Sequence, residues 1–173
     1  YDVTIDGGYG HRHFSVAAST TVELKNLTLW RGTAKSGSTP DDGGSILVNS
    51  GADVTIENVV FDDNGTGNFD THGGSIYNDG GTVSIVDSTF KDGRVRLNGG
   101  AIATVNSGTV TIRDSVFVRN ESYHTTTTYG GGAIWAASGT TTNIIDSMFA
   151  ENSAETSFTY SARHGGVIRA EGT

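Results

Sequence analysis

The chain has 173 residues, of which 25 are glycine, one is proline and none is cysteine, so disulfides and thiolate metal sites are excluded. The formal net charge of −8, with eleven scattered Lys and Arg residues, argues against nucleic acid, which needs clustered basic side chains. No run approaches the roughly 18–20 apolar residues that span a bilayer, so we expect no membrane insertion by this segment.

The start of the chain is expected to form a degenerate first coil of a repeat. Val3–Ile5 alternates apolar and polar residues as a strand does, and residues 13–16 occupy the place of another strand. A polar loop follows at 33–42. Comparable loops recur at 65–72, 94–98, 121–130 and 153–164. We expect all five to project from one edge of the molecule, where repeat proteins place variable contact surface.

Five pairs of adjacent glycines mark the repeat along the rest of the chain. Each pair is followed by one small residue or valine and then by isoleucine, and successive pairs lie 30, 26, 32 and 34 residues apart. The pairs begin at Gly43, Gly73, Gly99, Gly131 and Gly165. A period of this size indicates a solenoid of stacked repeats.

The clearest repeat, residues 99–120, predicts three short strands. Ile102 begins the first, Val110–Ile112 alternates with a period of two, and Phe117 lies in the third. Because β-branched residues take the inward positions and turn residues separate the strands, strands are favoured over helices. We predict an all-β, right-handed parallel β-helix of about five to six coils. Residues 1–173 form one domain, either a segment of a larger protein or one protomer of an end-to-end assembly.

Stacking the repeats predicts two apolar columns inside the solenoid. Equivalent residues of successive coils should stand about 4.8 Å apart, the spacing of paired strands. The aromatic column contains Leu29, Phe61, Phe90, Phe117 and Phe149. The isoleucine column contains Ile46, Ile76, Ile102, Ile134 and Ile168.

Two polar columns are expected at corners of the coil. One carries residues that tolerate a left-handed backbone, three positions after the aromatic residue: Gly32, Asn64, Gly93, Asn120 and Asn152. The other carries side chains that hydrogen-bond turn backbone: Asn26, Asn58, Asp87, Asp114 and Asp146.

The carboxylates of the second corner are the candidate metal ligands. Asp87, Asp114 and Asp146 would stand about 5 Å apart on consecutive coils, where a cation such as Ca²⁺ is attracted. In the competing interpretation, which we favour, each carboxylate accepts hydrogen bonds from its own turn amides. We therefore predict no metal site, no cofactor and no catalytic residue.

Other candidate residues have simpler interpretations. The acidic pairs are interpreted as solvated turn residues: Asp41 with Asp42, and Asp62 with Asp63. The histidines do not share one repeat position: His11, His13, His72, His124 and His164. Leu47, Tyr77 and Trp135 share an outward position that suits sugar stacking, although packing against a loop is favoured.

Three Asn-x-Ser/Thr sequences are glycosylation candidates, at Asn26, Asn64 and Asn120. Asn64 and Asn120 also belong to a corner column. An inward-stacked side chain there could not carry a sugar.

Gly-Gly-Ala-Ile followed by Phe-x-x-Asn, as in residues 99–120, resembles the repeats of the polymorphic outer membrane protein family and related secreted right-handed β-helix proteins. The resemblance extends over about residues 11–168 and departs from the family pattern at Gly93, where the pattern has asparagine. It implies a secreted or cell-surface protein used for adhesion or as structural material.

The leading hypothesis is thus a non-enzymatic extracellular or cell-surface solenoid with a structural or adhesive role, with surface glycans as candidate partners. The alternative is a carbohydrate-active, pectate-lyase-like enzyme or a glycan-binding module whose catalytic coils lie outside this segment. An ice-binding face is disfavoured, because only one short outward column is rich in hydroxyls: Thr55, Ser84, Thr111 and Asn143.

The two ends of the chain predict self-association. Residues 165–173 stop one strand into a coil, and Val3–Ile5 has the pattern of the strand that comes next. We therefore expect the C-terminal end of one copy to stack on the N-terminal end of another, within a longer chain or between subunits. Between subunits the contact is heterologous and propagates a filament. The competing interpretation is an excised fragment whose capping segments are missing.

Overall fold

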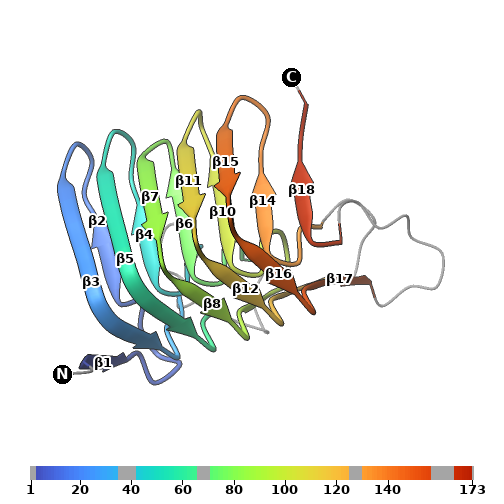
Figure 1. Ribbon diagram of the computed structural model, residues 1–173, viewed down its shortest axis with the longest axis horizontal. Coiled ribbons are helices and arrows are strands. Elements are labelled where there is room, and N and C mark those ends of the chain that lie inside the picture. Colours follow the sequence, from blue (N-terminus) through green and yellow to red (C-terminus); the bar gives the residue numbers. More distant parts are fainter. Residues whose placement is uncertain (1–2, 35–41, 66–70, 125–129, 157–165, 173) are drawn as a thin grey trace.

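The computed structural model describes residues 3–34, 42–65, 71–124, 130–156 and 166–172. In these residues the chain is an all-β parallel solenoid of about 4 turns with three parallel sheets, which confirms the predicted fold class (Figure 1). The two termini lie at opposite ends of the stack. The described residues form no helix that could cross a membrane.

The six-stranded sheet runs along the stack and is built of short strands. Its order is β18-β14-β10-β6-β4-β2, and every pairing is parallel. The strands are β2 (Phe14–Val16), β4 (Ile46–Val48), β6 (Ile76–Asp79), β10 (Ile102–Val105), β14 (Ile134–Ala136) and β18 (Ile168–Ala170).

The nine-stranded sheet bends into two arms. Two strands run through the bend: β3 (Thr21–Trp30) and β5 (Asp53–Asp62). The first arm continues with β7 (Thr82–Val86), β11 (Thr109–Arg113) and β15 (Thr141–Ile145). The second arm contains β1 (Val3–Asp6), β8 (Thr89–Lys91), β12 (Val116–Val118) and β16 (Met148–Ala150). A three-stranded sheet completes the coils: β9 (Arg94–Val95), β13 (Glu121–His124) and β17 (Ser153–Thr156).

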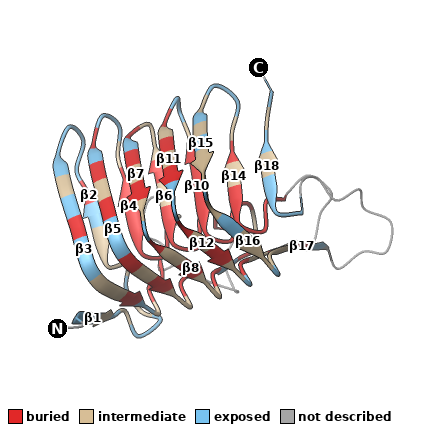
Figure 2. Cartoon of the chain, viewed as in Figure 1, coloured by how far each residue is buried: buried red, intermediate tan, exposed pale blue. Residues whose placement is uncertain are grey.

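Both predicted apolar columns are confirmed. The four phenylalanine rings stack with centroids 4.4, 4.6 and 4.7 Å apart and planes within 8° of parallel. Leu29 is in register with Phe61 at the front of this column. The five isoleucines are also in register, and all but Ile168 in the last coil are fully buried. Figure 2 shows the buried residues along the middle coils and the exposed ones toward the ends.

The second predicted corner is confirmed as the bend between the arms. The residues of this column have φ between 47° and 54°, a left-handed backbone that Asn and Asp tolerate better than most residues: Asn26, Asn58, Asp87, Asp114 and Asp146. One left-handed residue turns the chain from the first arm into the second.

The first predicted corner is wrong by one residue. The left-handed residues are Arg31, Asp63, Asp92, Arg119 and Glu151, with φ between 52° and 56°. The asparagines that follow instead use their side chains to hydrogen-bond the backbone of the preceding coil. Asn120 Oδ1 accepts from the Gly93 amide at 3.1 Å, and its Nδ2 donates to the Phe90 carbonyl at 3.0 Å. Gly93 is required for close approach, because a Cβ there would lie 2.4 Å from the Gly100 carbonyl oxygen.

A serine ladder at the bend is a feature that the sequence patterns did not reveal. Its members are Ser88, Ser115 and Ser147. Each hydroxyl donates to the carbonyl two residues earlier at 2.8 Å and accepts an amide of the preceding coil at 3.1 Å. The ladder therefore joins coils through buried hydrogen bonds, which are costly to leave unmade.

The first strand of the chain lies in a different place from the one expected. β1 pairs with Leu27–Trp30 in the second arm, so Ile5 is aligned with Leu29 of the aromatic column. The pattern of Val3–Ile5 predicts a strand of the first arm, equivalent to Val110–Ile112, and this placement is wrong. Alternation is the same in both arms, so the pattern alone cannot distinguish them.

Candidate functional site

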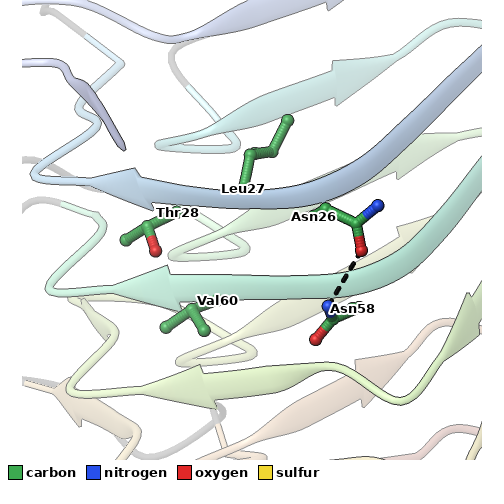
Figure 3. A pocket seen from close by; sticks show the side chains of 5 residues that line it. All are labelled: Asn26, Leu27, Thr28, Asn58 and Val60. Carbon is green, nitrogen blue, oxygen red and sulfur yellow. Dashed lines mark hydrogen bonds between the residues drawn. The ribbon is translucent and has the colours of Figure 1, made fainter. Parts of the chain in front are cut away.

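A surface pocket lies at the bend of the two long strands. Its lining residues are Asn26, Leu27, Thr28, Asn58 and Val60 (Figure 3). Asn26 and Asn58 are exposed at the bend itself, and Thr28 and Val60 are partners in adjacent strands. The pocket therefore combines two amides, one hydroxyl and the aliphatic side chain of Val60, while the side chain of Leu27 packs against the apolar core.

The two amides are joined to each other. Asn58 Nδ2 donates to Asn26 Oδ1 at 2.9 Å. This bond uses one hydrogen-bonding group of each amide and orients both. In the part of the chain that the structure describes, no side chain or backbone group bonds the Nδ2 of Asn26 or the Oδ1 of Asn58.

The charged groups near the pocket form ion pairs. Lys25 Nζ lies 2.8 Å from Glu57 and 2.9 Å from Glu23, and these contacts, the Glu57 bond foremost, raise the pKa of Lys25. Asp62 lies 2.9 Å from Lys91 Nζ. These charges largely compensate one another at the pocket.

An exposed indole adjoins the pocket along β3. Trp30 follows Thr28 by two residues, so alternation puts both on the outer face of the second arm, and 36% of Trp30 is exposed. The guanidinium carbon of Arg31 lies 3.7 Å from the indole centroid, a cation–π contact that holds the ring. Arg31 also pairs with Asp6, and this hydrogen bond lowers the pKa of Asp6.

The carboxylates of the candidate metal column are exposed and stand at the bend with a left-handed backbone: Asp87, Asp114 and Asp146. The side-chain hydrogen bonds of these turns come from the serine that follows each aspartate, so the favoured interpretation named the wrong residue. Within the described ranges, no group of three or more His, Cys, Asp or Glu side chains is arranged to hold a metal.

Two histidines have structural contacts. His13 Nδ1 lies 2.9 Å from Ser45 Oγ, and its Nε2 lies 3.2 Å from the Trp30 carbonyl oxygen. The ring of His72 stacks on Trp135 with centroids 4.8 Å apart. The side chain of His124 and all of His164 lie outside the described residues.

The outward stripe is packed, as the favoured interpretation expects. Leu47 is buried, His72 covers Trp135, and the Trp135 Nε1 donates to Glu171 Oε1 at 3.1 Å. Burial, the main cause, raises the pKa of Tyr77. The stripe is thus no open platform for a sugar.

The acidic pairs are bonded rather than merely solvated, which corrects the expectation. Asp62 pairs with Lys91, and Asp63 accepts the hydroxyl of Tyr9. Asp42 Oδ1 accepts the His72 amide at 2.6 Å. Asp41 lies outside the described residues.

The three glycosylation candidates differ in accessibility. Asn64 and Asn120 are buried, and their Nδ2 atoms donate to the carbonyls of Leu29 and Phe90. The folded chain therefore has no room for a glycan at either position. Asn26 is exposed at the pocket.

Sequence reasoning missed the pocket and Trp30. The available signal was the alternation Thr28-x-Trp30 directly after a corner asparagine, which puts an aromatic ring on the outer face. The row of Thr28 and Trp30 lies beside the strand of Asn58 because β3 pairs with β5, and a sequence pattern does not reveal this pairing.

Comparison with known proteins gives the chain a family. No curated protein and no solved structure matches it significantly. The family model described as right-handed beta helix region matches residues 11–169, the part that contains the stacked coils. Because this match spans most of the chain, the protein belongs to the right-handed β-helix family.

Proposed function

We propose that this chain is a non-enzymatic β-solenoid with a structural or adhesive role outside the cell or on its surface. The observation that supports this proposal is the set of hydrogen bonds that its buried polar side chains make. Asn64, Asn120 and Ser115 all bond backbone groups of neighbouring coils, so they stiffen the stack instead of meeting in a reactive cluster.

The outer faces of this stack suit adhesion. Residues of successive coils stand in register, so a partner with a repeating structure would meet the same chemistry on each coil. In the first arm one such row is Thr82, Thr109 and Thr141. The resemblance of residues 99–120 to polymorphic outer membrane protein repeats supports a surface location and surface glycans as partners.

End-to-end self-association is part of this proposal. Stacking two copies would set β1 of one copy on β16 of the other and β2 on β18, which continues two of the sheets. One strand position between β15 and β3 of the next copy would stay empty, because β1 belongs to the second arm. Any junction between copies therefore has an irregular first arm.

The test is incubation of the purified chain with polygalacturonate and with neutral glycans, followed by assays for reducing ends and unsaturated products. We expect no turnover. Product formation that scales with protein concentration would contradict the proposal and favour a carbohydrate-active enzyme.

A further inference from the structure

We propose that the pocket at the bend of β3 and β5 binds a neutral saccharide unit, with Asn26, Asn58 and Thr28 as its polar contacts. This inference rests on the proposed adhesive role and names the ligand class and the residues for it. The pocket lies on the outside of the bend, where Asn26 is hydrogen-bonded to Asn58 and Thr28 is aligned with Val60 (Figure 3).

The polar groups of the pocket match sugar hydroxyls. The bond between the two amides leaves the Nδ2 of Asn26 to donate and the Oδ1 of Asn58 to accept. Thr28 adds a hydroxyl that does both. A sugar hydroxyl also donates and accepts, so adjacent hydroxyls on one ring can bond a fixed donor and a fixed acceptor together.

The apolar groups match the C–H surface of a pyranose. Val60 lines the pocket on the outer face, and Trp30 continues the outward row beyond Thr28. Arg31 restrains the indole, so less conformational entropy is lost when a ring packs beside it. Apolar walls with a few fixed polar groups are the usual composition of small-ligand sites.

Charge selects a neutral sugar over a uronate. Lys25 is engaged by Glu23 and Glu57, and Asp62 is paired with Lys91, so no unpaired cation borders the pocket within the described residues. The next coils carry Asp87 and Asp114 at the bend, where a polyuronate chain would be repelled.

The test compares binding of cellotetraose, galactotetraose, mannotetraose and trigalacturonate by isothermal titration calorimetry. The double variant Asn26→Asp, Asn58→Asp keeps the fold, because Asp87, Asp114 and Asp146 hold the same left-handed position in later coils. We expect at least one neutral tetrasaccharide to bind the wild-type chain. The double variant should lower that affinity at least tenfold.

A second readout uses the two tryptophans of the chain. Trp135→Phe leaves Trp30 as the only indole, and its fluorescence should change with the bound neutral sugar. Asn106→Asp is the matched control, because Asn106 is also an exposed asparagine with a left-handed backbone (φ 51°) and does not line the pocket. It should bind as the wild type does. Wild-type binding of no neutral tetrasaccharide, unchanged binding by the double variant, an equal loss in Asn106→Asp, or preference for trigalacturonate would overturn the inference.

Failure of this inference is separable from failure of the proposed function. If the chain neither binds a neutral tetrasaccharide nor cleaves a glycan, the proposed saccharide site is wrong and the structural role still stands. Turnover of a glycan contradicts the structural or adhesive role, whatever the double variant does to binding.

Discussion

At the scale of single residues, buried polar side chains hold the coils together. Asn120 bonds Gly93 and Phe90 of the preceding coil, and Asn152 in turn bonds the Asn120 amide at 2.9 Å. Each asparagine thus satisfies backbone groups that side-chain loss would leave buried and unpaired. This is the reason an amide, with one donor and one acceptor end, occupies the position.

Replacing Asn120 with Ala should therefore destabilise the fold by about 2–6 kcal/mol, since one buried donor and one buried acceptor lose their partners at roughly 1–3 kcal/mol each. Urea unfolding followed by circular dichroism measures this change. Asn143→Ala, at an exposed position of β15, is the control and should cost under about 0.5 kcal/mol. Equal losses of stability in the two variants would contradict this role of the Asn120 side chain.

His13 should make stability depend on pH. Desolvation, which outweighs its contact with the Trp30 carbonyl and the charge of Asp6, lowers the pKa of His13. The unfolded chain then binds the proton more readily, so the free energy of unfolding falls as pH drops below the unfolded value of about 6.5. Urea midpoints between pH 8 and about 5 should fall less in His13→Gln than in the wild type. Parallel pH curves would show that His13 contributes nothing.

At the scale of the element, one left-handed residue per coil divides the long strands and makes the two arms. β3 and β5 pass through this bend with Asn26 and Asn58 at φ 54° and 52°, and later coils use aspartate at the same place. The serine after each aspartate then bonds the preceding coil. The bend is therefore defined by backbone conformation and by contacts between coils.

Asp114 tests the requirement for left-handed backbone at the bend. Asp114→Ala should lower the free energy of unfolding by about 1 kcal/mol, because a Cβ without a local polar group disfavours positive φ. Asp114→Gly should be closer to the wild type, because glycine has no such penalty. Thermal unfolding ranks the three proteins. An alanine variant as stable as the glycine variant would show that φ is not the constraint.

At the scale of the whole molecule, the solenoid presents unpaired strand edges in its last coil. β15, β16 and β18 each pair on one side only within the described residues, and Ile168 and Met148 are exposed there at 38% and 55%. Such edges pair readily with another strand unless they are covered.

The proposed self-association predicts that residues 1–173, prepared as a separate chain at high concentration, form end-to-end fibres that electron microscopy would show. The six-stranded sheet implies an axial repeat of about 29 Å per copy at about 4.8 Å per strand. Ile168→Lys puts a charge on the exposed edge and should leave discrete particles. Discrete wild-type particles at high concentration would contradict stacking.

The repeats in the sequence were enough to predict the solenoid, both apolar columns and the bend. These follow from side-chain type repeated at a fixed interval, since one coil of strands must bury its apolar residues on the next. Phe117 and Ile102 could be placed inside from alternation alone.

Which residues meet between coils could be seen only in the folded stack. The partners of Asn120 lie 27 and 30 residues earlier, Val3–Ile5 fits either arm by pattern, and the pocket needs Asn26 beside Asn58. These contacts depend on the register of one coil against the next. A local pattern of alternation carries no information about that register, because it is the same in every strand.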